Sequence, residues 1–217
     1  MKREILTKDA ATWLTRHKDV GSIITSLPDH DEIEGLTANW DKESSLSIEA
    51  WQGWFTETAR LCMEVTSPKC PTIFYQTDRK ANGRLYSKAA LLYRAAENEG
   101  VRTLWHKIAL RRDVGARDLY RPTYTHLIAF SREGKPGKPT PDVFNRGRTL
   151  YPNGMGIGAA AIAVKFAALS TDTIVDPFCG RGTVPAVANA YGLKAIGVDI
   201  DPQQTEKAKA LNLRRSA

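Results

Sequence analysis

Two apolar stretches near the end of the chain, each closed by an aspartate, constrain the fold more than any other feature. The first is IVDPFCGRGT, in which a glycine loop follows Asp176. The second is KAIGVDID, in which Asp199 closes the apolar stretch as Asp176 closes the first. Gly180 and Gly182 allow a backbone to approach a ligand closely, and an acid after the second strand can accept from both ribose hydroxyls. The pattern predicts an α/β fold with a nucleotide-like ligand beyond the strand ends.

The loop DPFCGRGT differs from the GxGxxG of a pyrophosphate site. A pyrophosphate requires several glycine amides at a helix start, whereas here a carboxylate, Asp176, lies where a cationic amino-acid group can be held. A nicotinamide dehydrogenase is therefore disfavoured. The alternative without a ligand is a tight strand-to-helix turn in the first stretch and a solvated helix cap in the second.

The rest of the chain alternates short apolar runs with helical patterns, which favours a largely parallel sheet covered by helices. Strands are predicted at 3–7, 21–26, 72–78, 103–110, 124–131, 173–175 and 194–198. Helices are predicted at 10–14, 47–65, 87–99, 155–169, 185–191 and from 202 onwards. The strands at 103–110 and 124–131 are expected to pair at an antiparallel edge. Residues 29–46 and 132–148 are expected to be exposed loops, because they are polar or rich in proline, glycine and basic residues.

The positive charge is concentrated in one segment. Residues 79–148 hold 16 Lys/Arg against 6 Asp/Glu, a net charge of +10, while the remainder holds 15 against 18, a net charge of −3. A basic segment on a nearly neutral body is typical of a surface that binds a polyanion, because neutralising phosphates releases counterions. The alternative is a solvated basic face without a partner.

Several classes of protein are excluded by what the sequence lacks. It has no apolar run of about 18 residues and no signal-peptide pattern, so we expect a cytoplasmic protein without a membrane segment. The three cysteines form no CxxC pair, and their odd number suits a reducing compartment. The four histidines show no metal-ligand spacing, so no metal site is expected.

The segment DPFCGRGT resembles motif I of the class I S-adenosyl-L-methionine (SAM)-dependent methyltransferases, and the chain is similar to the circularly permuted amino-methyltransferases of nucleic acids. The resemblance implies that one group of residues surrounds the methionine and sugar of SAM: Asp176, Pro177, Phe178, Cys179, Gly180, Gly182 and Thr183. GVDID resembles motif II, so Asp199 is expected to bind the ribose and Ile200 to contact the adenine. The fold implied is a Rossmann-like sandwich with a mostly parallel, seven-stranded sheet and an antiparallel edge.

The order of the remaining motifs implies a circular permutation, because the chain ends only 18 residues after Asp199 and the missing strands must lie elsewhere. ILTKDAATWL resembles motif III, in which Asp9 would accept from the adenine amino group and Ala10 would offer its amide to the ring. The alternative is that Asp9 is an ordinary helix cap. YPNGMG lies where the family has motif X, and there a helix start would offer free amides to the SAM carboxylate near Asn153, Gly154 and Met155. The motif order is III, IV, X, I, II.

Ser26, Leu27, Pro28 and Asp29 match motif IV only in part. In the family an Asp, Asn or Ser side chain and the next carbonyl accept hydrogen bonds from the target amine, and an aromatic residue stacks on a flipped base. Here Leu27 replaces a proline and Asp29 replaces the aromatic residue, so Asp29 is expected to accept a proton or to hold a ring nitrogen. Stacking would then come from another aromatic residue: Trp40, Trp51, Trp54 or Tyr75. The alternative is a simple turn after a strand.

These observations together predict methyl transfer from SAM to a nucleic acid, RNA or DNA, at a base nitrogen. We expect one domain, 1–217, in which 79–148 recognises the substrate. Arginines in this segment are candidates for backbone contact: Arg79, Arg111, Arg112, Arg117 and Arg121. Tyr120 or Tyr124 would stack on an unpaired base. The alternatives are a methyltransferase for small molecules or proteins, and a SAM-binding protein without catalysis.

Overall fold

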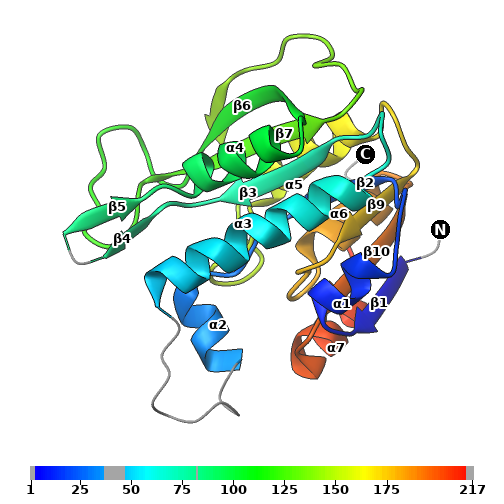
Figure 1. The fold of residues 1–217 in the computed structure, drawn as a ribbon, viewed down its shortest axis with the longest axis horizontal. Helices are drawn as coiled ribbons and strands as arrows, with labels where there is room; N and C mark the ends of the chain where they lie inside the picture. Colours follow the sequence, from blue (N-terminus) through cyan, green and yellow to red (C-terminus); the bar gives the residue numbers. More distant parts are fainter. Residues whose placement is uncertain (1–2, 37–46, 82, 214–217) are drawn as a thin grey trace.

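The computed structural model describes residues 3–36, 47–81 and 83–213, with the side chains of 34–36 and 81 left out of the description. An eight-stranded mixed sheet forms the centre of the fold (Figure 1). Its strands lie in the order β1 (Arg3–Thr7), β10 (Lys194–Asp199), β9 (Thr173–Asp176), β2 (Ser22–Thr25), β3 (Thr72–Gln76), β7 (Tyr124–Ser131), β6 (Arg102–Leu110) and β8 (Val143–Asn145). Every neighbouring pair is parallel except those that β7 makes with β3 and β6.

Helices cover both faces of this sheet. On one face lie α1 (Ala10–Thr15), α3 (Ile48–Val65) and α4 (Lys88–Asn98). The hydrophobic core between these helices and the sheet includes the fully buried Trp51 and Phe55 of α3. On the other face lie α5 (Ile157–Ala167) and α6 (Thr183–Ala190), and α7 (Pro202–Ala210) packs beside β1 and β10. Buried alanines line the inner side of α5, because side chains with no γ-carbon let the helix approach the sheet closely.

The sheet order brings the two ends of the sequence together. In the middle, β9 from the last third of the chain pairs in parallel with β2 from the first part. At one edge, Thr7 of β1 lies in register with Asp199 of β10. The carboxyl ends of β1, β10, β9, β2 and β3 therefore lie along one edge of the sheet, where ligands bind in open α/β folds. The predicted motifs I, II, III and IV follow four of these five strands.

Two of the predicted loops contain regular structure. The loop expected at 29–46 begins with α2 (His30–Leu36), and its remainder, with Trp40, lies outside the described residues. The α2 helix starts there because the Glu32 carboxylate accepts from the Asp29 amide at 2.8 Å, while the Glu32 amide donates to the Asp29 carbonyl at 3.0 Å. The loop expected at 132–148 contains β8, so the sheet has eight strands where the sequence predicts seven.

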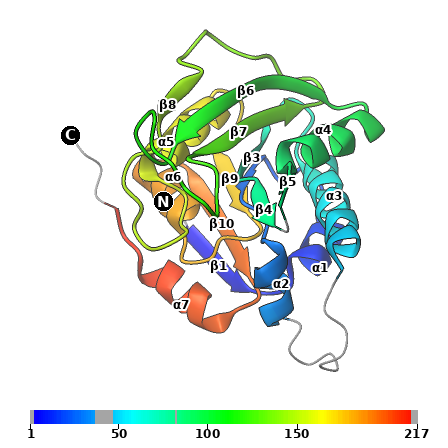
Figure 2. The ribbon, with the colours of Figure 1, turned by 90° about the vertical axis from the view of Figure 1, so that its left-hand side faces the viewer.

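A short hairpin extends from the end of β3. It consists of β4 (Arg79–Ala81) and β5 (Arg84–Tyr86), which pair antiparallel, and it is separate from the main sheet. Figure 2 looks at the molecule from the side on which this hairpin projects, with α2 below it. A hydrogen bond of 3.1 Å from the Lys80 ammonium to the Asp118 carbonyl ties the hairpin to the loop between β6 and β7.

Candidate functional site

Asp176 lies at the bottom of the site, at the end of β9. One carboxylate oxygen accepts from the Thr25 hydroxyl at 2.7 Å and from the Phe178 amide at 3.2 Å. The side chain is almost completely buried, and this desolvation raises the pKa of Asp176 to about 7. The two hydrogen bonds favour the ionised form and lower the pKa, but their effect is smaller than that of burial. A nearby cationic group would restore the ionised carboxylate.

The glycine loop after Asp176 is connected to the end of β10. The Gly180 amide donates to one oxygen of the Asp199 carboxylate at 2.8 Å, and the Asp201 amide donates to the other at 3.0 Å. Desolvation raises the pKa of Asp199 as well. Each carboxylate oxygen has a second lone pair, so Asp199 can still accept from a ligand.

The two glycines of this loop have different roles. Gly180 has a φ of +50°, and a Cβ at this position would meet no atom within 4 Å, so its Cα faces open space that a ligand can enter. Gly182 has a φ of +83°, and a Cβ there would lie 2.8 Å from the Ala208 Cβ. Gly182 therefore allows α6 and α7 to pack, while Gly180 allows close approach of a ligand.

The predicted motif III lies beside this loop, since the Lys8 amide donates to the Asp199 carbonyl at 3.0 Å. The Asp9 carboxylate caps α1 through one oxygen, which accepts from the Thr12 amide at 2.8 Å and from its hydroxyl at 2.7 Å. Ala10 is buried, and Ile200 is half exposed on the neighbouring strand end. The helix-cap interpretation of Asp9 is therefore correct in this structure, and its contact with adenine stays a prediction.

The helix start in the predicted motif X differs from the expectation of free amides. The Ile157 amide donates to the Arg148 carbonyl at 3.0 Å and the Ala159 amide to the Arg146 carbonyl at 3.1 Å, because the segment after β8 packs across the start of α5. The segment still belongs to the site: the Tyr151 hydroxyl lies 2.8 Å from the Thr183 hydroxyl. Within it Asn153 is exposed, Gly154 is partly buried and Met155 is buried. Their contact with SAM stays a prediction.

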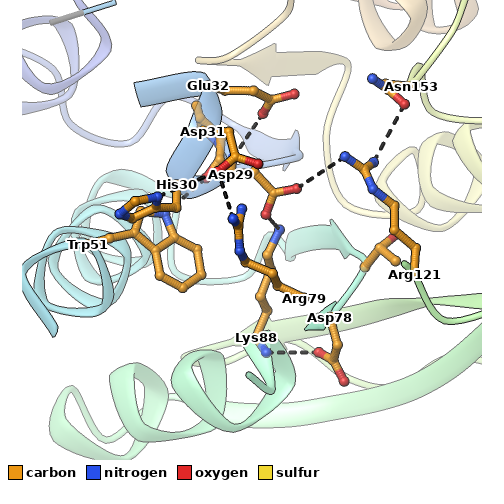
Figure 3. A network of polar contacts seen from close by, with 12 residues as sticks. Asp29, His30, Asp31, Glu32, Trp51, Asp78, Arg79, Lys88, Arg121 and Asn153 are labelled. Carbon is orange, nitrogen blue, oxygen red and sulfur yellow. Dashed lines mark hydrogen bonds and ion pairs between the residues drawn. The ribbon is translucent and has the colours of Figure 1, made fainter. Parts of the chain in front are cut away.

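The predicted motif IV follows β2 directly. The Ser26 side chain is exposed and that of Leu27 is buried in the core. The Asp29 carboxylate forms an ion pair with Lys88 through one oxygen, and its other oxygen lies 3.9 Å from the Arg121 guanidinium. Figure 3 shows Asp29 between these two cations. Arg121 also donates to the Asn153 amide oxygen at 3.5 Å, which connects this segment to the one before α5.

The aromatic residues proposed for stacking lie mostly in the interior. Trp51 is fully buried, and its indole N–H lies 3.4 Å from the Pro28 carbonyl, so it cannot stack on a base. Tyr75 is also buried. Trp54 is partly exposed and meets the Phe178 ring edge to face at 6.0 Å between centroids. Trp54 is thus the one candidate among the described aromatic residues of that group with an accessible surface.

Among the five candidate arginines, Arg121 lies beside Asp29, and the other four differ in exposure. Arg79 forms an ion pair with Asp31 at 2.7 Å, and Arg111 donates to the Pro122 carbonyl at 3.2 Å, while burial lowers the pKa of Arg111. Arg112 and Arg117 are exposed on the β6–β7 loop. These two therefore remain the better candidates for backbone contact.

Sequence reasoning missed a buried polar chain behind the site. Asp78 accepts from the Lys88 amide at 2.8 Å, and its second oxygen lies 3.1 Å from His126 Nε2. His126 Nδ1 lies 2.9 Å from His106 Nε2, and His106 Nδ1 lies 2.8 Å from the Tyr93 hydroxyl. The polar cluster at 76–80 was a usable signal for Asp78, but nothing in the sequence indicates which histidines pair. Across 3–36, 47–81 and 83–213, no three His, Cys, Asp or Glu side chains are grouped to hold a metal ion.

Comparisons with known proteins identify a family for part of the chain and a fold for nearly all of it. Residues 133–210, from the segment before β8 to α7, match the model of the N6/N4 methyltransferase family, described as DNA methylase. No curated protein sequence matches the chain. In the described part of the chain, no helix has the length and apolar character needed to cross a membrane.

Solved structures of methyltransferases share the whole fold. The cytosine-N4-specific PvuII DNA methyltransferase superposes with a TM-score of 0.75 at 14% identity, over 96% of this chain and 86% of its own. A protein of Thermus thermophilus described as a DNA modification methylase, in complex with SAM, gives 0.70 at 19% identity, over 96% and 92%. The SAM complex of M1.HpyAVI gives 0.64 at 14%, over 96% and 99%. The predicted Rossmann-like methyltransferase fold is therefore confirmed.

Proposed function

We propose that this chain, whose fold and motifs are those of the SAM-dependent DNA methylase-like proteins, transfers a methyl group from SAM to a base nitrogen in a nucleic acid. The observation that carries the proposal is the convergence of Asp176, Asp199 and Asp29 on one edge of the sheet, after β9, β10 and β2. We infer from the chain order of these strands that the fold is a circular permutation of the class I methyltransferase order. The cofactor half of the site thus comes from the end of the sequence and the acceptor half from the beginning.

The described residues fit SAM. Asp176 is a buried carboxylate whose raised pKa reflects desolvation, so a cationic ligand beside it would be stabilised. Gly180 leaves open space on the ligand side of the loop, and the Asp199 carboxylate can accept from ribose hydroxyls. When bound, SAM supplies a methyl group on a sulfonium sulfur, which is a good leaving group.

The protein's contribution is to orient the acceptor. The exposed Ser26 hydroxyl and the Asp29 carboxylate lie at the end of β2, where both can accept hydrogen bonds from a target amine and aim its lone pair at the methyl group. Asp29 is also placed to receive the proton that the amine loses. Leu27 and Trp51 are buried in the same hydrophobic cluster, and the Trp51 indole N–H lies 3.4 Å from the Pro28 carbonyl, so this segment rests on the core.

A nucleic acid is favoured as the acceptor by the segment 79–148. Arg112 and Arg117 are exposed on the β6–β7 loop, and Tyr120 on the same loop is 80% exposed. Exposed arginines neutralise phosphates, and an exposed aromatic ring offers a stacking surface for an unpaired base. RNA and DNA both satisfy these features. A cytoplasmic location of the protein remains a prediction from the sequence. Within the segment 79–148 of one domain, 1–217, the exposed β6–β7 loop acts as the recognition region.

The test is transfer of a labelled methyl group from SAM to total RNA and to unmethylated genomic DNA. We expect label in one polymer with the wild type, and loss of label with Asp29→Ala and with Asp199→Ala. Asp172→Asn is the matched control, because this exposed carboxylate precedes β9 and so lies at the amino end of the strand, away from the carboxyl ends that form the site. Calorimetry with SAM separates the two losses, since Asp199→Ala should weaken SAM binding and Asp29→Ala should not.

Other outcomes would refute parts of the proposal. SAM binding without label in either polymer would indicate a SAM-binding protein without catalysis, or an acceptor of another class. Transfer that persists after Arg112→Glu and Arg117→Glu would favour a small-molecule or protein methyltransferase, because such an acceptor does not need the basic loop.

A further inference from the structure

A buried lysine lies against the Asp29 carboxylate. Lys88 is the first residue of α4, and only 3% of its side chain is exposed. Its ammonium forms an ion pair with one Asp29 oxygen and lies 5.9 Å from the centre of the Trp51 ring. Lysine is rarely buried without a partner, because an unpaired charge in the interior is costly. The Asp29 carboxylate therefore cannot rotate away without leaving the ammonium unpaired.

The backbone of Lys88 is fixed as well. Its amide donates to one Asp78 oxygen at 2.8 Å, and the other Asp78 oxygen lies 3.1 Å from His126 Nε2. Asp78 is itself buried, so the start of α4 is attached to the polar chain behind the site. A functional group is held accurately when the residue that supports it is locked by its own hydrogen bonds. Lys88 meets this condition.

The ion pair makes the two oxygens of Asp29 unequal. The oxygen on Lys88 is buried, although 17% of the Asp29 side chain is exposed. The second oxygen lies 3.9 Å from the Arg121 guanidinium, which is longer than a hydrogen bond. Figure 3 shows the carboxylate between these two cations. Asp29 therefore presents one accessible acceptor atom, in an orientation that the contact with Lys88 sets.

We propose that Lys88 is a positioning residue for methyl transfer, an inference that rests on the proposed function. Lys88 holds Asp29 so that the second carboxylate oxygen faces the target amine. Because Lys88 is buried, it acts through Asp29 and not through contact with the acceptor. A displacement of a reacting group by about 1 Å can lower a rate about 100-fold, so this anchoring sets the rate of transfer and not the affinity for SAM. The role is the same whichever base carries the amine.

The test is a double-mutant cycle on methyl transfer to the polymer that the wild type labels. Lys88→Met removes the ammonium and keeps an apolar side chain of similar size, so we expect kcat to fall roughly 10- to 100-fold. The affinity for SAM, measured by calorimetry, should stay within about twofold, because Asp176 and Asp199 lie at the ends of other strands, β9 and β10.

The second arm of the cycle starts from Asp29→Asn. The Asn oxygen can still accept from Lys88, which leaves the amide nitrogen, a donor, facing the target amine. This variant already has a low kcat, and adding Lys88→Met should lower kcat by less than about threefold, because the residue through which Lys88 acts is no longer functional. The double variant also removes both charges, so its comparison with Asp29→Asn is informative even if Lys88→Met alone fails to fold.

Lys107→Met is the matched control. Lys107 on β6 is also a buried lysine, with 5% of its side chain exposed, and its ammonium pairs with Asp142 at 3.1 Å instead of with a residue of the site. Lys107→Met should therefore lower stability in urea but change kcat by less than about twofold.

Different results would overturn different statements. An unchanged kcat in Lys88→Met, or an equal fall in kcat with and without Asp29→Asn, would refute the positioning role and leave the proposed function standing. An equally large loss of kcat in Lys107→Met would show that general destabilisation is the cause, which also refutes it. No label in any polymer with the wild type would overturn the proposed function and this inference together.

Discussion

The buried Asp176 makes the stability of the SAM-free protein depend on pH in a direction that can be worked out. Its pKa in the folded protein is about 7, against a usual value of 3.8, because burial outweighs the hydrogen bonds from Thr25 and Phe178. Between these two values the folded state binds more protons than the unfolded state, so the contribution of Asp176 to the free energy of unfolding falls as pH rises. About three units of difference correspond to about 4 kcal/mol. The contribution is complete below pH 3.8 and is lost above pH 7.

Asp176→Asn isolates this effect, because the Asn oxygen can still accept from Thr25 and Phe178 while the side chain cannot ionise. We would measure urea unfolding of both proteins from about pH 4.5 to about pH 8 without SAM. The free energy of unfolding of the variant minus that of the wild type should rise by about 3 kcal/mol across this range. The difference cancels the titration of other carboxylates, such as Asp78, whose pKa shifts in the opposite direction. A difference that stays flat with pH would refute the reasoning.

Three further predictions concern the loop, the ion pair and the basic surface. Gly180→Ala should weaken SAM binding by about 10-fold in calorimetry with the fold retained. Gly182→Ala should instead lower the free energy of unfolding by about 2 kcal/mol, since its Cβ meets α7. If both variants changed SAM binding and the free energy of unfolding equally, this division would be wrong. Lys88→Met should lower the free energy of unfolding by about 3 kcal/mol in urea, and no loss would show that its ion pair is not maintained. Arg112→Glu with Arg117→Glu should weaken polymer binding and reduce its logarithmic salt slope by about 2; an unchanged slope would exclude phosphate contact.

The positions of Asp176 and Asp199 in the fold were predictable because their sequence signal is local. A strand, a glycine loop and an acid follow one another within a short stretch, and the structure places Asp176 and Asp199 at neighbouring strand ends as that pattern requires. The contact between Thr25 and Asp176 was not predictable in the same way. It depends on β2 pairing with β9 across more than half of the sequence, and a pattern of apolar residues does not specify which strands become neighbours.

The missed elements had weak or misread signals. β8 has three residues within a segment rich in proline and glycine, and it forms only because β6 offers a free edge. The hairpin β4–β5 had a usable signal that was not recognised, the Asn82-Gly83 dipeptide between two short strands. The role of Lys88 had none, because a lysine in the first turn of a helix is normally exposed.

The polar chain behind the site fixes the tautomers of two histidines. If both imidazoles are neutral, the ionised Asp78 can only accept, so His126 carries its proton on Nε2 and accepts at Nδ1. His106 must then donate from Nε2 and accept at Nδ1 from the Tyr93 hydroxyl. All the hydrogens therefore point in one direction, from α4 across β6 and β7 to Asp78. Nitrogen chemical shifts should report the same tautomer for both rings, and Tyr93→Phe would remove the first donor of the series while leaving that polarity intact.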